Sequence, residues 1–487
     1  MLRQLLTRGS SAVFGNLMSF AASLIAVKIF ALLLGPTGQG QISIIKQLFQ
    51  SLNLISSLNC QSAITEGISS KESNIKKQAF YSSALLLTFI STSIALPALY
   101  IAGRNGLTIE FLNKPTNVLL LFFAVLFASF NVVCVGVLNG LNQIKSIIRG
   151  TVLNGTLQLL LAAPSALLLK NNNTDLFIAY LLLVQIALFT YYSTNLLKMG
   201  LFPRLNKAIN FNELWNILRP TVALFISGAS AALTLLGIRL LISNTAGYHA
   251  AGLFDAAWTI ANTNATLVLT SLSIIYFPGL LKSENTHEKL THYKLIFRLS
   301  LMIFGPLLVI ISTGRGIATY ILFSDEFSRS ADILKFILIG DLFKSLVYTC
   351  GYLCLSLRKY TNYALIDLSW SIVFFSASFL VIDSGKYEYI GIAYATSYAL
   401  AFCVYATLAS HWIAWRPSGK ELIVLAGFLS LLCVSAAISP RSLSEAAAFA
   451  TPVTGIAVGL SLCLMTKNER EGLLRFMRSL RRRAENL

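Results

Sequence analysis

The sequence predicts an all-α integral membrane protein with about 14 transmembrane helices, arranged as two pseudo-symmetric six-helix bundles and two additional C-terminal helices. The first observation is composition: of 487 residues, 55% are hydrophobic and only 12% are charged, whereas soluble proteins carry about twice that charged share. The second observation is that apolar stretches of membrane-spanning length recur along the whole chain. The third is a resemblance between two stretches of the chain, which indicates an internal repeat.

Fourteen apolar stretches have the roughly 20 residues that a transmembrane helix needs. They lie at about 10–34, 41–64, 79–103, 117–141, 151–170, 176–198, 220–242, 252–280, 295–323, 333–357, 363–383, 390–415, 421–440 and 447–466. The first stretch is too long for the apolar region of a secretory signal, and it ends in GPTG rather than in a cleavage site. All loops are short, so we expect no soluble domain outside the membrane.

The distribution of lysine and arginine predicts the orientation of the helices. With the N-terminus inside, most of the 38 basic residues fall in the inside loops and the two tails, and few fall in the outside loops. Positive charge is enriched on the cytoplasmic side of membrane proteins, so we expect both termini in the cytoplasm. The net charge of +18 therefore indicates topology rather than nucleic-acid binding. We expect a multi-pass protein of the bacterial inner (cytoplasmic) membrane.

The repeat divides the chain into domains. The stretch VKIFALLLGPTGQG at the end of the first helix resembles IRLLISNTAGYHAAG at the end of the seventh, and helices four and ten also end alike. Such parallel repeats are common in transporters, whose sites lie between the halves near the midplane. We predict an N-terminal six-helix bundle at 1–200, a C-terminal six-helix bundle at 201–416, two additional helices at 417–466 and a basic cytoplasmic tail at 467–487.

Five cations lie deep within the predicted helices. Counted at about 1.5 Å per residue, the outer half of the membrane or its middle holds Lys28, Lys46, Arg239, Arg315 and Lys344. A charge within hydrocarbon costs several kcal/mol. Snorkelling to the interface accounts for any single one of them, but it is a poorer explanation for all five together. We interpret the five as lining a hydrated cavity that binds an anion.

Fewer acidic residues lie within the helices. They are Asp255, Asp341 and Asp367, and Asp341 lies three residues before Lys344, where the two side chains can pair on one helix face. We assign supporting roles to Asp341, Asp255 and Arg298. The second and eighth helices are rich in Ser, Thr, Asn and Gln, which either line a hydrated cavity or form hydrogen bonds between helices.

No catalytic or metal-binding arrangement is predicted. The seven cysteines are scattered through apolar segments, where cysteine behaves as a small hydrophobe. The four histidines fall in loops or near helix ends, and no nucleotide-binding motif is present. We therefore expect no cofactor and no metal ion.

Two stretches resemble the Wzx-type flippases of the MOP exporter superfamily, which move undecaprenyl-pyrophosphate-linked sugars. LLLGPTGQGQISIIKQLFQSLNLISSL resembles their helix 1–2 signature, and ILFSDEFSRSADILKFILIGDLFKSLVYTCGYL, with GDLFK at 340–344, resembles their helix 9–10 stretch. The resemblance covers 10–415, is nearest to O-antigen translocases and the lipid III flippase, and implies a MOP/MATE-like fold. Relatives of this branch commonly have twelve helices, and the additional pair resembles the layout of the lipid II flippase MurJ.

The resemblance and the cations together favour transport. The expected activity is to translocate an undecaprenyl-pyrophosphate-linked oligosaccharide, such as an O-antigen repeat unit of lipopolysaccharide, from the cytoplasmic to the periplasmic leaflet by alternating access. Lysine and arginine bind phosphate well, so we expect the five cations to hold the pyrophosphate. The alternatives are a lipid II-type flippase, a cation or drug antiporter, and a membrane glycan polymerase or ligase. The first helix lacks the carboxylate that an antiporter needs, and the outer loops are short for such an enzyme.

The expected partners follow from this function. Besides the lipid-linked oligosaccharide they are membrane lipids and a Wzy-type polymerase, and we expect neither nucleic-acid binding nor enzymatic activity. We expect a monomer. The C-terminal sequence KNEREGLLRFMRSLRRRAENL predicts an amphipathic helix on the anionic inner surface of the membrane.

Overall fold

The computed structural model describes residues 2–71, 73–104, 110–170, 174–201, 211–283, 285–438 and 443–465. These residues form α-helices, three short 3₁₀ helices and their connections, and no β-strand occurs among them. The α-helices are α1 Leu2–Ser57, α2 Gln61–Ser69, α3 Asn74–Arg104, α4 Pro115–Gly140, α5 Ile144–Lys170, α6 Thr174–Lys198, α7 Phe211–Lys282, α8 Thr286–Thr313, α9 Arg315–Leu322, α10 Ser330–Ser356, α11 Tyr360–Asp383, α12 Ile390–Ile413, α13 Gly419–Ala437 and α14 Leu443–Leu464. The predicted tail at 467–487 lies outside the described residues.

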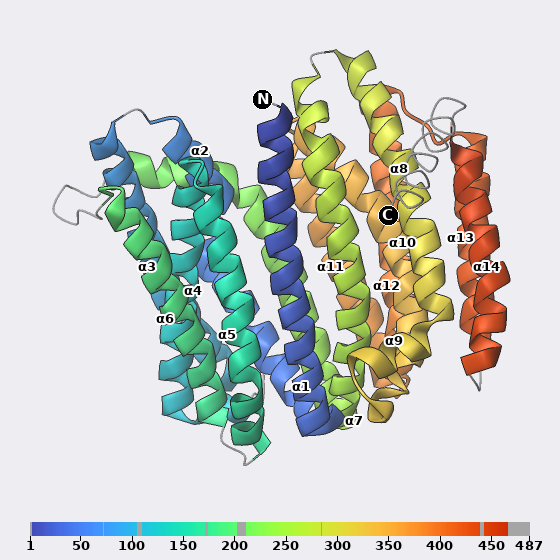
Figure 1. The fold of residues 1–487 in the computed structure, drawn as a ribbon, viewed down its shortest axis with the longest axis horizontal. Helices are drawn as coiled ribbons and strands as arrows, with labels where there is room; N and C mark the ends of the chain where they lie inside the picture. The colour runs from blue at the N-terminus through green and yellow to red at the C-terminus, as the bar shows by residue number, and fades with distance from the viewer. Residues whose placement is uncertain are drawn as a thin grey trace, which may run out of the picture. The chain divides into compact units, whose positions relative to one another are not determined.

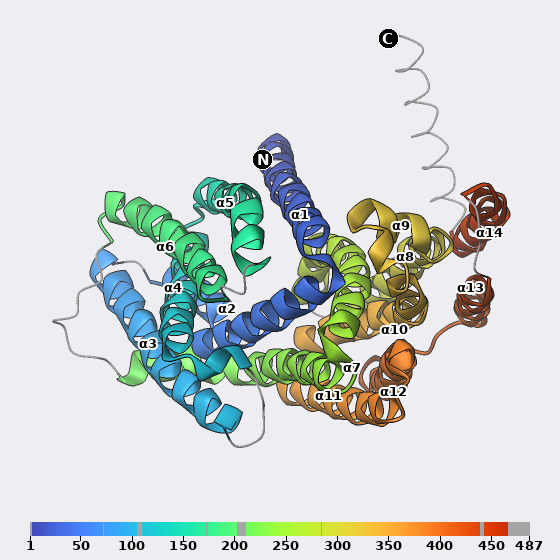
Figure 2. The same ribbon diagram turned by 90° about the horizontal axis from the view of Figure 1, so that it is seen from below.

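Two of these helices are kinked pairs of predicted spans. In α1 the kink is at Gly35, with φ 61°, and in α7 it is at Gly247, with φ 82°. Glycine adopts such positive φ values without steric cost, and Pro36 lacks the N–H that an unbroken helix uses there. Figure 2 shows the change of direction within α1. The predicted turn after the first span is therefore a single-residue break.

The structure confirms the predicted all-α membrane fold. Among the residues that the structure describes, ten stretches are long and apolar enough to cross a membrane, and two of them, Met18–Ser69 and Thr221–Thr270, include the kinks of α1 and α7. Helix α10 is not among the ten. In α14 the apolar stretch is the shorter segment Ala448–Leu464.

Two predicted spans have different boundaries in the structure. The span expected at 41–64 is interrupted where Leu58 and Asn59 adopt positive φ between α1 and α2. The span expected at 295–323 ends at Thr313, and the short helix α9 begins at Arg315. Hydropathy alone does not detect either break, because apolar residues lie on both sides of it.

The chain forms two compact units. Unit 1 comprises Met1–Asp255, Leu322–Phe327 and Ile382–Tyr387, and unit 2 comprises Ala256–Ile321, Ser328–Val381 and Glu388–Leu487. The bundle boundaries expected after residues 200 and 416 stay predictions.

Each unit has its own pattern of helix packing. In unit 1, α5 packs along α1 and α6 along α4, and Figure 1 shows α3 to α6 side by side. In unit 2, α12 packs along α10, and α8 contacts α10, α13 and α14. Helices α4 and α6 correspond to α10 and α12 in the predicted repeat, so the same pairing occurs in both halves.

The cores are built from different side chains. Unit 1 buries a largely aliphatic cluster that includes Leu48, Ile64 and Leu121. Near the start of α8, unit 2 buries aromatic rings instead: Trp415 lies with its ring centroid 4.9 Å from that of Tyr293 and 4.8 Å from that of Phe297. These three side chains are almost completely inaccessible, so they fix the segment between α12 and α13 against α8.

Candidate functional site

The two kinked helices cross in backbone contact within unit 1. Gly40 follows the α1 kink by five residues, and Gly252 follows the α7 kink by the same number. A β-carbon at Gly40 would overlap the carbonyl oxygen of Tyr248, and one at Gly252 would overlap that of Pro36. Because only glycine permits this approach, the crossing depends on both glycines. The reciprocal contacts agree with the predicted alignment of the two stretches.

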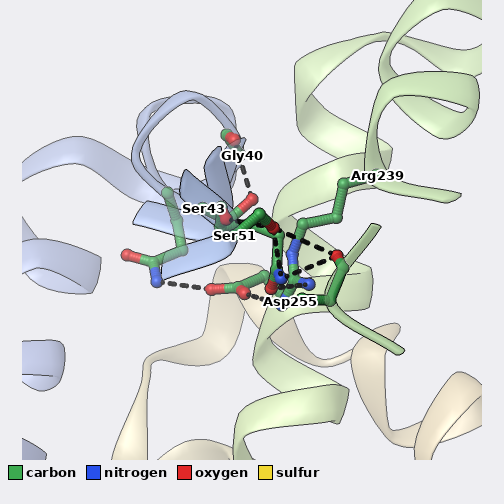
Figure 3. Close-up of polar contacts among 8 residues, drawn as sticks. Gly40, Ser43, Ser51, Arg239 and Asp255 are labelled. Carbon is green, nitrogen blue, oxygen red and sulfur yellow. Dashed lines mark hydrogen bonds and ion pairs between the residues drawn. The ribbon is translucent and has the colours of Figure 1, made fainter. Parts of the chain in front are cut away.

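A buried network of charged and amide side chains lies next to this crossing (Figure 3). The Arg239 guanidinium donates to Asp255 Oδ1 at 2.8 Å and to Gln47 Oε1 at 2.8 Å. Gln39 Nε2 donates to the other carboxylate oxygen of Asp255 at 2.9 Å. Arg239 is 4% and Asp255 8% exposed. The network therefore joins both halves of α7 to the second half of α1.

The amide and hydroxyl groups of α1 continue this network toward α7. Gln47 Nε2 and the Ser51 hydroxyl both donate to the carbonyl oxygen of Ala232, each at 3.2 Å. Just beyond the end of α1, Asn59 Nδ2 donates to the carbonyl oxygen of Leu224 at 3.2 Å. For the polar residues of the second predicted span we considered two roles, lining a hydrated cavity or forming hydrogen bonds between helices. At these positions they form hydrogen bonds between helices.

Lys46 adds an unbalanced positive charge to the network. Its side chain is half-buried, and its ammonium lies 4.6 Å from the ring centroid of Phe30, a cation–π distance. Asp255 acts on it electrostatically, but that carboxylate is already bound by Arg239 and Gln39. Since two cations share one carboxylate, the site has a net formal charge of +1 among these side chains. Lys28, earlier on α1, is half-buried as well.

A second buried charge pair lies in unit 2, in the middle of α10. The Lys344 ammonium is 3.9 Å from Asp341 Oδ1 and donates to Asn262 Oδ1 at 3.4 Å. The Tyr394 hydroxyl donates to the same Asp341 oxygen at 2.9 Å. The ring of Trp258 lies beside both, 6.0 Å from the ammonium and 5.2 Å from the Tyr394 ring. The expected pairing of Asp341 with Lys344 is therefore present, and an aromatic wall surrounds it.

Arg315 has a different environment from the other cations. Its NH1 group donates to the carbonyl oxygens of Ser312 and Ser435, at 2.9 and 2.8 Å, and its NH2 group donates to that of Ile438 at 2.7 Å. Ser312 and Ser435 lie in the last turns of α8 and α13, and Ile438 directly follows α13. Carbonyl oxygens at the C-terminal end of a helix have no N–H donor within that helix. Arg315 thus joins the ends of α8 and α13. As a substrate contact it stays a prediction, and that role would require these bonds to break.

Arg298 lies nearer the other end of α8. It lines a cavity together with Arg416 and Glu421, at the start of α13. Unit 2 therefore separates three of the predicted site residues: Lys344 is in the middle of α10, Arg298 is in the first half of α8, and Arg315 is the first residue of α9. In unit 1, by contrast, Lys46, Arg239 and Asp255 come together.

The structure adds residues that the sequence did not single out. Gln39 and Tyr394 each bind a buried aspartate, yet each is far from its partner in the sequence. The only local signal was the high density of amide side chains in the second span. Among the described residues, no group of three or more His, Cys, Asp and Glu side chains is arranged to hold a metal ion.

Comparisons with known proteins identify the fold. No protein-family model matches the sequence, and no curated protein does. The inward closed conformation of the lipid II flippase MurJ is similar with a TM-score of 0.68 and 12% identity, over 96% of this chain and 100% of that chain.

Two other solved structures are similar over less of the chain. An inward-facing multidrug resistance MATE family transporter of the MOP superfamily has a TM-score of 0.66 and 13% identity, over 82% of this chain and 96% of that chain. A MOP superfamily transporter from Pyrococcus furiosus, whose binding pocket has reverse polarity, has a TM-score of 0.60 and 15% identity, over 83% and 96%. The chain therefore has the fold that these transporters share.

Proposed function

We propose that this protein is a flippase that translocates an undecaprenyl-pyrophosphate-linked oligosaccharide from the cytoplasmic to the periplasmic leaflet by alternating access. The observation that carries the proposal is the net positive charge next to the crossing of α1 and α7, where Lys46 and Arg239 share the single carboxylate of Asp255. Uncompensated charge inside a membrane protein is costly and marks a pathway for an ion or substrate. A pyrophosphate group supplies the missing negative charge.

The polarity of the site argues against a cation or drug antiporter. Such a transporter needs an acidic group in its early helices to bind a cation, and the first acidic residue of this chain is Glu66, beyond both spans of α1. The buried Asp255 is already hydrogen-bonded to Arg239 and Gln39. An anionic substrate fits the cations of the site, whereas a cationic drug would be repelled by them.

The extent of the structural likeness supports the flippase branch. The lipid II flippase MurJ is covered over its whole length and aligns with 96% of this chain, whereas the MATE family transporter aligns with 82%. An alignment over 96% of this chain is long enough to include α13 and α14 as well as the two bundles. The O-antigen-type oligosaccharide rests on the sequence resemblance over 10–415.

The network near the crossing has features of a gate that opens and closes. Two buried polar atoms in it, Arg239 Nε and Gln39 Oε1, have no hydrogen-bond partner among the described residues, although buried polar groups are nearly always satisfied. A network that is incomplete in one conformation costs less to rearrange. In alternating access, the side of α1 and α7 that carries the network opens once in each cycle.

The orientation and location belong to the same proposal. Positive-inside sorting of the lysines and arginines places both termini in the cytoplasm and the two kinks toward the periplasm of the bacterial inner membrane. A Wzy-type polymerase that consumes the flipped oligosaccharide would then act downstream.

The proposal is tested by a flipping assay in proteoliposomes with a labelled undecaprenyl-pyrophosphate-linked oligosaccharide. Lys46→Ala and Lys28→Ala should each lower the flipping rate about 10- to 100-fold, the value of one charge-assisted hydrogen bond of about 1.5–3 kcal/mol. The matched control is Lys386→Ala, which removes an exposed lysine between α11 and α12, and which should flip at the wild-type rate.

Three outcomes would contradict the proposal. Equal flipping rates in Lys46→Ala, Lys28→Ala and Lys386→Ala at equal protein amounts would exclude the cations as the pyrophosphate site. Proton-coupled efflux of a cationic dye by the wild-type protein, without flipping, would favour the antiporter. A change in the glycan chain itself would favour the polymerase or ligase.

A further inference from the structure

A cavity of about 530 Å³ lies where α8 and α13 begin. One wall is a face of α8 that includes Lys294 and Arg298, and the other is formed by Arg416, Ser418 and Glu421. Three cations from two separate parts of unit 2 therefore converge on one concavity, with a single carboxylate among them.

The backbone holds Arg416 at the cavity. Ala414, which ends α12, adopts a left-handed conformation with φ 52°, which costs free energy in a residue other than glycine. The conformation turns Trp415 into the core, between Tyr293 and Phe297. Arg416 follows directly and is exposed. Burial of one side chain thus orients the next one toward the cavity.

The carboxylate of Glu421, which lines the cavity, is already hydrogen-bonded within the chain. Glu421 Oε2 accepts hydrogen bonds from the Ser418 backbone N–H at 2.7 Å and from the Ser418 hydroxyl at 2.9 Å, and the Glu421 N–H donates back to that hydroxyl. This capping box secures the first turn of α13. The charge of the lining is therefore dominated by Lys294, Arg298 and Arg416.

The position of the cavity places it at the edge of the hydrocarbon region. It lies near the start of two apolar helices, Thr286–Thr313 and Gly419–Ala437. Directly beyond it on α13, Leu422 and Ile423 are 48% and 70% exposed, as expected of side chains that face acyl chains. A positively charged concavity beside an apolar helix face is complementary to a phosphate group with acyl chains attached.

We propose that this cavity binds the phosphate of an anionic membrane phospholipid, with the acyl chains along the exposed face of α13. Basic pockets between transmembrane helices bind anionic headgroups in this way, and arginine pairs with phosphate in two-pronged geometry. The positive-inside rule requires only that the cytoplasmic loops carry lysine and arginine. It does not require three cations to converge on one concavity. The proposal is independent of the transported substrate.

The test is native mass spectrometry of the full-length protein in detergent, with added phosphatidylglycerol, phosphatidylcholine or inorganic phosphate. The wild-type protein should retain one phosphatidylglycerol in preference to phosphatidylcholine. Lys294→Gln and Arg416→Gln change exposed side chains, so both variants should fold, and each should weaken phosphatidylglycerol binding about fivefold. Arg416→Lys keeps the charge and should retain most of the binding.

The matched control is Lys420→Gln, which removes a neighbouring exposed lysine that does not line the cavity. Its phosphatidylglycerol affinity should stay within about twofold of the wild type. The proposal is overturned if Lys420→Gln weakens binding as much as Arg416→Gln, if neither cavity variant weakens it, or if inorganic phosphate alone binds as tightly as the lipid.

Discussion

The two buried charge pairs of this protein are built in opposite ways. In unit 1, Arg239 and Asp255 come from different halves of the kinked α7, meet at 2.8 Å and are bound by amides of α1. In unit 2, Asp341 and Lys344 lie one turn apart on α10, at 3.9 Å. The first pair therefore joins the two halves of α7 to α1, whereas the second lies within a single helix.

The glycines beside the two charge pairs also make different contacts. Gly252, three residues before Asp255, faces the backbone carbonyl of Pro36. Gly340, directly before Asp341, faces the side chain of Tyr394. The Gly252 contact is thus with another backbone, whereas the Gly340 contact is with a ring that is itself buried and packed against the rings of Trp258, Phe374 and Tyr398. Unit 1 holds its pair beside a backbone crossing, and unit 2 holds its pair against a packed aromatic wall.

The largest effect is expected from Asp255→Ala. This change leaves the Arg239 guanidinium buried without its counter-ion and next to Lys46, and loss of one member of a buried pair costs about 3–5 kcal/mol. The thermal unfolding midpoint of the purified protein in detergent should fall sharply. The double variant Asp255→Ala/Arg239→Leu, which removes both charges, should recover at least part of the loss. If the double variant is no more stable than Asp255→Ala, the pair is not what stabilises the crossing.

A smaller effect is expected at the glycines. Gly252→Ala should destabilise the protein by about 1–3 kcal/mol, the usual cost of overpacking, because its methyl group meets the Pro36 carbonyl. Gly340→Ala should also be destabilising, since its methyl group meets the Tyr394 ring, which is buried among other rings and cannot turn away. Unfolding midpoints of both variants, measured side by side, test this, and a wild-type midpoint in either variant would show that the contact at that glycine relaxes.

The smallest effect is expected from Asp341→Asn, at about 1 kcal/mol. Asparagine keeps an oxygen that accepts from the Tyr394 hydroxyl, and Lys344 keeps its hydrogen bond to Asn262. In the proteoliposome assay, Asp341→Asn should reduce flipping less than Lys344→Ala does, because the aspartate only positions its neighbour. Equal losses in both variants would show that the aspartate has a role of its own in transport.

Local sequence features were sufficient to predict much of the fold. The end of the first predicted span at GPTG and the resemblance of the two stretches that contain Gly40 and Gly252 predicted a break and a correspondence, which appear as the kinks and the crossing. Helix length follows from hydropathy, because the membrane sets it. The interruptions around Leu58 and Gly314 were not predicted, since local backbone geometry decides them while the composition stays apolar.

The partners of the buried charges were harder to predict. Asp341 and Lys344 are neighbours on one helix, so their pairing follows from spacing. Asp255 pairs instead with Arg239, which is 16 residues away, and with Gln39, which is 216 residues away. Such pairs depend on which helix faces pack together, and hydropathy does not report this. Arg315, which depth alone placed in a cavity, is bound by carbonyls of two helix ends for the same reason.

The bonds of Arg315 also bear on how the chain is made. The arginine is synthesised 120 residues before Ser435, whose carbonyl it binds. Until α13 enters the membrane, the nascent protein holds a guanidinium that lacks two of its acceptors, those at Ser435 and Ile438. Insertion of α13 thus completes the set of hydrogen bonds of Arg315. A nascent chain that stops at Pro417 leaves the Arg315 guanidinium without these two acceptors, which α13 and the residue after it supply.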